Sequence, residues 1–126
     1  MSIQTSIDSD TGFRMHVVTG DISMDDVRRT LEETYAHADF RAEADAMWDL
    51  TGASGDLETE EIRHLADFVG KLVGSATAGK VALLVSSDFE FGMARMYESI
   101  LGGQSSKPIM VFRDRAEADR WLAERD

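Results

Sequence analysis

Residues 81–101 contain the pattern that decides the fold, VALLVSSDFEFGMARMYESIL. The first five positions are all apolar, which is typical of a strand covered on both faces of a sheet. Ser87 then stands three residues before Glu90, and this spacing predicts a capping box at the start of a helix. The predicted helix has one apolar face, made of Phe89, Met93, Met96, Tyr97 and Ile100. A buried strand that leads directly into a helix indicates an α/β fold with parallel strands.

The same order of strand and helix continues toward the C-terminus. Residues 109–112 are again all apolar, and they predict a second buried strand. Asp114 stands three residues before Glu117 and predicts the cap of a last helix. The buried side chains of that helix are expected to be Ala118, Trp121 and Leu122.

Toward the N-terminus, two strand-like segments at residues 3–7 and 13–18 flank a predicted hairpin turn, DSDTG at residues 8–12. Polar and apolar residues alternate in the second segment, as in a strand with one solvated face. We therefore expect His16 to face solvent.

Two further predicted helices flank a short apolar strand at residues 46–50. Ser23, with Asp26 three residues later, predicts the start of the first helix. Its apolar stripe is Val27, Leu31 and Tyr35. Thr59 is expected to cap the second helix, whose predicted buried face is Ile62, Leu65, Val69, Leu72 and Val73.

Taken together, these segments predict the element order ββαβαβαβα. Strands that alternate with helices imply parallel crossovers, and the opening hairpin adds one antiparallel edge. No repeat, low-complexity tract or linker divides the chain, so we predict one domain over residues 1–126. The predicted architecture is a mixed five-stranded sheet covered by four helices.

The composition limits both the chemistry and the partners. The chain has no cysteine, which excludes disulfides, thiolate metal sites and a cysteine nucleophile. Its three histidines form no i, i+4 pair and no phosphate-binding loop is present, so we predict no metal and no cofactor. Residues 1–60 hold 14 acidic and 4 basic side chains of a chain with net charge −11, which disfavours nucleic acid and anionic lipid surfaces as partners. One explanation of the acidity is solubility or adaptation to a salty environment. The alternative is an acidic docking face for a basic partner.

Targeting and membrane signals are not visible in the sequence. The N-terminal residues MSIQTSID have neither the basic region nor the apolar region of a signal peptide. The longest apolar run, at residues 81–85, is far shorter than the roughly 20 residues that a membrane span needs. We therefore predict no membrane insertion and expect a cytoplasmic protein.

Candidate binding residues stand at the carboxyl ends of the predicted strands, where ligands bind in open α/β sheets. Ser87 and Asp88 lie at a helix N-terminus, which either binds an anion or is simply capped by these side chains. Asp49 interrupts an apolar strand. It either accepts hydrogen bonds from backbone N–H groups that follow the strand or has a ligand-binding or regulatory role. No arrangement of nucleophile and base is visible, so no catalytic residue is predicted.

The helix after the buried strand offers two further candidate surfaces. Its Met and aromatic stripe, which includes Tyr97, is either core packing or the wall of a pocket for an apolar ligand. Gly92, Arg95 and Ser99 lie on a neighbouring face, and a glycine inside a helix costs about 1 kcal/mol relative to alanine. This cost suggests a close approach by another chain, and we expect a homodimer through this face. The alternative is that Arg95 pairs only with Glu98 and that Gly92 accommodates an element of its own chain.

Several segments resemble the small bacterial SpoIIAA-like proteins, which are related in fold to STAS domains. These segments are Trp48–Thr51, Phe91–Tyr97, Val111–Asp114, Glu117–Ala118 and Trp121–Leu122. Together with the element order, the resemblance covers most of residues 10–122. It implies a fold that is shared with CRAL-TRIO lipid-transfer domains.

In the anti-sigma factor antagonists of this fold, an Asp-Ser pair at the helix after the central strand carries a phosphorylation switch. The corresponding stretch here is GDLET at residues 55–59, in which the serine is missing and Glu58 stands near its place. The resemblance therefore implies the fold without this switch, and we expect neither Ser54 nor Thr59 to replace it.

The sequence thus predicts a non-enzymatic regulatory or protein-interaction module. The alternative is a binding domain for a small apolar or lipid-like ligand, in a pocket near the helix at residues 88–101.

Overall fold

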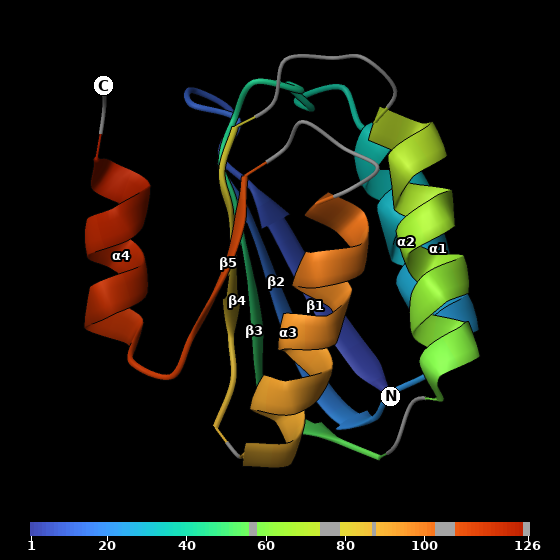
Figure 1. The fold of residues 1–126 in the computed structure, drawn as a ribbon. Helices are drawn as coiled ribbons and strands as arrows, with labels where there is room; N and C mark the ends of the chain where they lie inside the picture. The colour runs from blue at the N-terminus through green and yellow to red at the C-terminus, as the bar shows by residue number, and fades with distance from the viewer. Residues whose placement is uncertain (56–57, 74–78, 87, 103–107, 125–126) are drawn as a thin grey trace.

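Figure 1 shows the computed structural model, which describes residues 1–55, 58–73, 79–86, 88–102 and 108–124. The element order is the predicted one. The elements are β1 (Ser2–Ile7), β2 (Arg14–Asp21), α1 (Met24–Tyr35), β3 (Ala46–Ser54), α2 (Thr59–Val73), β4 (Val81–Leu84), α3 (Asp88–Gly102), β5 (Ile109–Phe112) and α4 (Arg115–Ala123).

Five strands form one mixed sheet in the order β1-β2-β3-β4-β5, which confirms the predicted fold class. The β1–β2 pair is antiparallel and the other pairs are parallel. In the predicted hairpin turn, Asp8 Oδ1 accepts hydrogen bonds from the backbone N–H groups of Asp10 (2.8 Å) and Thr11 (2.9 Å). Gly12 ends the turn at φ 78°, a conformation that favours glycine.

The strand order explains where the helices lie. Each parallel strand is added on the same side of the preceding one, so right-handed crossovers bring α1, α2 and α3 to one face of the sheet. Helix α4 follows the last strand and covers the other face (Figure 1). The sheet therefore separates two hydrophobic cores, and the residues of Val81–Val85 are all buried between them, as predicted.

The core beneath α4 contains Met47, Ala82, Leu84, Phe112, Ala118 and Leu122. The core beneath α1, α2 and α3 is larger and takes the alternate strand residues, among them Ala46, Leu83 and Val111.

His16 corrects the sequence prediction, because its side chain is only 1% exposed. Arg14, His16 and Val18 are buried alternate residues of β2 and line the space under α1, α2 and α3, whereas Phe13 and Met15 pack against the core under α4. Alternation along β2 predicts one solvated face. Because helices cover both faces of this sheet, the alternate residues of β2 instead point into two different cores.

The start of α2 also differs from the prediction, by one residue. The carbonyl of Glu58, not of Thr59, accepts the first helical bond, from the N–H of Ile62 at 3.1 Å. The N–H of Glu58 donates to Glu61 Oε1 at 3.1 Å, which is the reciprocal bond of a capping box. The predicted caps at Ser23 and Asp114 are confirmed by the hydrogen bonds that their side chains accept from backbone N–H groups.

The predicted buried face of α3 is correct at Tyr97, which contacts the core, and wrong at Met96, which is 38% exposed. Phe91 and Ala94 also contact the core. The side chains of Phe89, Met93 and Ile100 lie outside the described part of the structure. Ser87, which was expected to cap this helix, lies outside the described residues.

Candidate functional site

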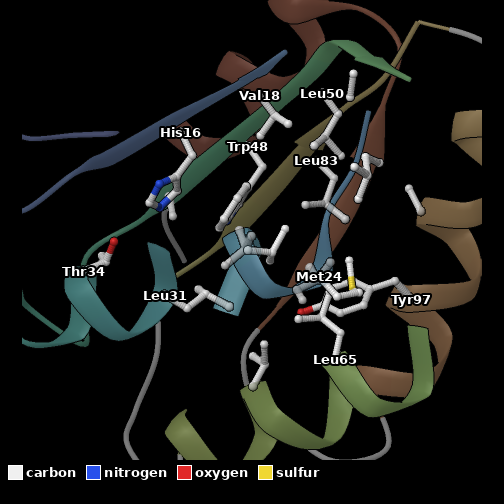
Figure 2. A pocket seen from close by; sticks show the side chains of 18 of the residues that line it. His16, Val18, Met24, Leu31, Thr34, Trp48, Leu50, Leu65, Leu83 and Tyr97 are labelled. Atoms are coloured by element: carbon white, nitrogen blue, oxygen red, sulfur yellow. The ribbon is translucent and has the colours of Figure 1, made fainter. Parts of the chain in front are cut away.

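A cavity of about 150 Å³ lies between the sheet and the helices α1, α2 and α3. Its walls are mostly apolar and come from β2, β3, β4 and the three helices (Figure 2). Prominent among the lining side chains are Val18, Leu31, Trp48, Leu50, Leu65 and Leu83.

Small side chains on facing elements help to explain why this space is unfilled. Ala46 and Ala53 of β3 and Ala94 of α3 are buried and all line the cavity. Each side chain ends at Cβ and cannot reach across the gap between sheet and helix. Because protein interiors are otherwise packed to crystal-like density, with few voids larger than a water molecule, a space of this size is a distinct feature.

Two stacked rings form one wall of the cavity. His16 of β2 pairs with Trp48 of β3 in the sheet, and their ring centroids are 4.1 Å apart with 27° between the planes. Tyr97 of α3 lines the same cavity and lies at the opposite end from His16 (Figure 2). The wall therefore offers flat aromatic surface to a guest.

His16 is held as a neutral ring. Its Nδ1 shares a hydrogen bond of 2.8 Å with Thr5 Oγ1. Burial, with a smaller contribution from the neighbouring Arg14, lowers the pKa of His16 to about 4. One ring nitrogen therefore carries a proton at neutral pH while the other accepts.

Arg14 is a second buried polar side chain in the lining. Its Nη1 donates to the backbone oxygen of Arg41 at 3.0 Å, and its guanidinium carbon lies 5.0 Å from the centre of the Phe40 ring. Burial lowers the pKa of Arg14. The segment between α1 and β3 thus engages the guanidinium at the edge of the cavity.

Two hydroxyl groups complete the polar part of the lining. Thr34 Oγ1 donates its proton to the carbonyl of Thr30 at 2.7 Å and can otherwise only accept. Burial raises the pKa of the Tyr97 hydroxyl, so this group stays protonated. Within the described residues, the lining contains no carboxylate, lysine or cysteine. The cavity is therefore suited to binding a neutral apolar molecule.

Asp49, the described candidate among the predicted strand-end residues, is not part of the cavity lining. Asp49 Oδ1 accepts hydrogen bonds from the backbone N–H of Thr51 at 3.0 Å and from its hydroxyl at 2.6 Å, which confirms the expected bond from the following backbone. Asp88 is the first residue of α3, and Ser87 is not among the described residues.

Other polar groups at this edge of the sheet bond to one another. Ser54 Oγ donates to Asp21 Oδ1 at 2.7 Å, and Ser86 Oγ donates to the carbonyl of Thr51 at 3.3 Å. Among the residues that the structure describes, no three His, Cys, Asp or Glu side chains gather as metal ligands would. These polar groups are used in local structure, and the cavity lies between the sheet and the helices instead.

The predicted interface residues of α3 are exposed at the surface of the molecule. Gly92, Arg95, Met96 and Ser99 are exposed at helical spacing and form one stripe, which we call the α3 stripe. A Cβ atom at Gly92 would have no described atom within 4 Å, so Gly92 accommodates no element of the described part of its own chain. Arg95 Nη1 lies 3.9 Å from Glu98 Oε1, a weak contact between partly exposed groups.

The sequence pattern indicated the α3 wall of the cavity through Tyr97 but missed the larger walls. The pattern predicts a solvated position for His16. It predicts ordinary core positions for Trp48 and for the apolar residues of α1 and α2. The one available signal was the alanines within core-facing segments, at Ala46, Ala53 and Ala94. A sequence alone does not show that these three positions meet around one space.

No helix in the described part of the chain has the length and apolar character needed to cross a membrane. No protein-family model and no curated protein matches the sequence.

Two solved structures are similar to this chain over almost its whole length. One is an uncharacterised protein of the DUF3478 family with a SpoIIAA-like fold from Shewanella loihica, at 18% identity and TM-score 0.58, covering 97% of this chain and 93% of that one. The other is the anti-sigma factor antagonist SpoIIAA in its unphosphorylated form, at 14% identity and TM-score 0.61, covering 99% of this chain and 100% of that one. At these identities the similarity is one of architecture, and it agrees with the sheet order and element order described above. The chain therefore has the SpoIIAA-like fold that its sequence motifs predicted.

Proposed function

We propose that this protein is a non-enzymatic binding module that encloses a small apolar molecule between its sheet and the helices α1, α2 and α3. The single observation that carries this proposal is the cavity of about 150 Å³. An engineered apolar cavity of that volume in another protein stays dry and binds benzene or xenon. The size and lining of the cavity favour this function over the protein-interaction role that the sequence favoured.

The energetic argument follows from the volume. Unfilled volume closed off in a core is destabilising by about 24 cal/mol per Å³, so an empty space of this size costs at most on the order of 3 to 4 kcal/mol. Domains of this kind are stable by only about 5 to 15 kcal/mol in total. A guest that fills the cavity recovers part of that cost through dispersion contacts and apolar burial.

The two tryptophans allow an internally controlled test. Trp48 lines the cavity, whereas Trp121 packs against Phe112 in the other core, with ring centroids 5.6 Å apart. We expect toluene to give a saturable fluorescence change in the Trp121→Phe variant, where Trp48 is the remaining tryptophan. The Trp48→Phe variant should not respond. No response in either variant, or an equal response in both, would contradict the proposal.

The natural guest can be sought separately from the test of binding. Native mass spectrometry of the purified protein reports any small molecule that stays bound, and the oligomeric state with it. A retained apolar molecule of a size that fits about 150 Å³ would support the proposal.

A regulatory role through protein contacts is our second proposal, and it can coexist with the first. Two observations favour it: the fold is like that of an anti-sigma factor antagonist, and the excess of acidic side chains lies in residues 1–60. Such a surface suits a basic partner, and binding to it should weaken as salt is raised. Mutating acidic residues should then slow association more than it speeds dissociation.

We also propose self-association through the α3 stripe, because Gly92 leaves open space there and Met96 exposes apolar surface. Light scattering on the wild type and on Gly92→Leu tests it. A dimer that becomes monomeric in Gly92→Leu, with unchanged circular dichroism, supports the interface. A monomeric wild type, or a dimer that the substitution leaves intact, rejects it.

A further inference from the structure

We propose that the guest of the cavity carries one hydroxyl group on an otherwise apolar body of ring size, and that His16 Nε2 binds this hydroxyl. This inference rests on the ligand-binding function proposed above and specifies the chemical class of the ligand.

The orientation of the His16 ring is the first step. Nδ1 is the ring nitrogen nearer the backbone, and it is bound to Thr5 Oγ1 of the neighbouring strand at 2.8 Å. Nε2 lies at the far edge of the ring and therefore points away from the sheet, toward the helices. His16 lines the cavity and is 1% exposed, so its ring is shielded from bulk solvent.

Nε2 has no hydrogen-bond partner among the described residues, since the bond of Nδ1 to Thr5 is the one hydrogen bond that the His16 ring makes there. A neutral ring nitrogen that faces the cavity can bond to a ligand group placed there. A ligand group that bonds to Nε2 gains a hydrogen bond that an apolar ligand of the same shape cannot make.

Hydroxyl is the group that fits the surrounding atoms in either tautomer of His16. If Thr5 donates to Nδ1, then Nε2 carries the proton and donates; if Nδ1 donates to Thr5, then Nε2 accepts. Thr34 Oγ1 lines the same end of the cavity (Figure 2) and has already given its proton to Thr30. When Nε2 carries the proton, a hydroxyl accepts from Nε2 and donates to Thr34 Oγ1. When Nε2 is the acceptor, the hydroxyl donates its one proton to Nε2.

The apolar lining and the neutral ring argue against a cationic ligand. The described lining offers no carboxylate to pair with such a guest, and its one charged side chain, Arg14, is itself a cation. Bringing an ammonium group into this space would be costly without a partner. The stacked surface of His16 and Trp48 favours a flat body, so phenol is a suitable minimal probe.

Phenol and toluene make a matched pair, because they differ only by a hydroxyl in place of a methyl group. We would measure both affinities by Trp48 fluorescence in Trp121→Phe, with and without His16→Phe, which keeps a ring against Trp48 but removes both nitrogens. The ratio between the variants cancels the different hydration of the two probes. We expect the preference for phenol over toluene to fall about fivefold to tenfold in His16→Phe, as for the loss of one hydrogen bond.

A second measurement uses the wild-type chain and does not depend on the folding of a variant. The ¹⁵N resonance of His16 Nε2 should shift on addition of phenol and should stay in place on addition of toluene. If both probes bind, the phenol preference is the same with and without His16, and Nε2 does not respond to phenol, then the hydroxyl assignment is wrong while the ligand-binding function stands. If neither probe changes Trp48 emission, the proposed function itself fails, and this inference fails with it.

Discussion

Acidification should destabilise the native protein through one buried side chain, His16. Its pKa is about 4 in the folded chain, because of burial and then of Arg14, against an ordinary value of 6.5. Between these two values the unfolded chain binds a proton that the native ring does not bind, so stability is retained above pH 6.5 and is lost as the pH falls toward 4. The full difference corresponds to roughly 3 kcal/mol at about 1.36 kcal/mol per pKa unit. Roughly 2 to 3 kcal/mol of it should be lost between about pH 7 and about pH 4.5.

Urea unfolding at the two pH values measures this loss as a difference between variants. His16→Gln removes the titrating group, whereas the carboxylates titrate in both proteins and cancel in the comparison. We expect the acid-induced loss of stability in His16→Gln to be smaller than in the wild type by roughly 2 to 3 kcal/mol. His64→Gln, at an exposed position of α2, is the matched control and should behave like the wild type. Equal losses in the wild type and in His16→Gln would refute the buried, neutral state of His16.

Three further predictions concern the cavity, a helix cap and the surface charge. Ala94→Leu should raise the free energy of unfolding in urea by about 1 to 2 kcal/mol, because each added carbon that fills the cavity contributes about 0.8 kcal/mol, less the cost of ordering the side chain. The same substitution should abolish the Trp48 response to toluene. A destabilised variant would show that no room exists beside Ala94. Asp114→Ala should lower the free energy of unfolding by about 1 kcal/mol, through loss of the 2.8 Å bond to the N–H of Ala116, whereas an unchanged value would mean that this cap contributes nothing. Duplex DNA should bind weakly or not at all at physiological ionic strength because the net charge is −11, and a salt-sensitive micromolar affinity would contradict this.

The order of the elements could be predicted because it follows from patterns among neighbouring residues. The apolar run at Val81–Val85 and the acidic cap at Asp114 depend on neighbouring residues only, and both were confirmed. The hydrogen bonds of Asp49 were predictable for the same reason, since its partner Thr51 is two residues away.

The site could not be predicted in the same way, because it depends on which residues meet in space. Alternation in β2 shows that His16 and Met15 lie on opposite faces of the sheet, but it does not show that both faces are covered. The cavity is the space that Ala46 and Ala94 leave between two elements far apart in the chain. Local patterns contain no information about such a volume, so the pocket was anticipated only as an alternative near α3.

The most direct test of ligand binding in the cavity is to locate a bound guest. Nuclear Overhauser effects between toluene and methyl groups assign its position residue by residue. Leu31 and Leu83 line the cavity, and the equally buried Leu122 lies in the core on the other face of the sheet. We predict contacts from toluene to the methyl groups of Leu31 and Leu83 and none to those of Leu122. Contacts to Leu122, or no contacts to any of the three at saturating toluene, would contradict the proposed function.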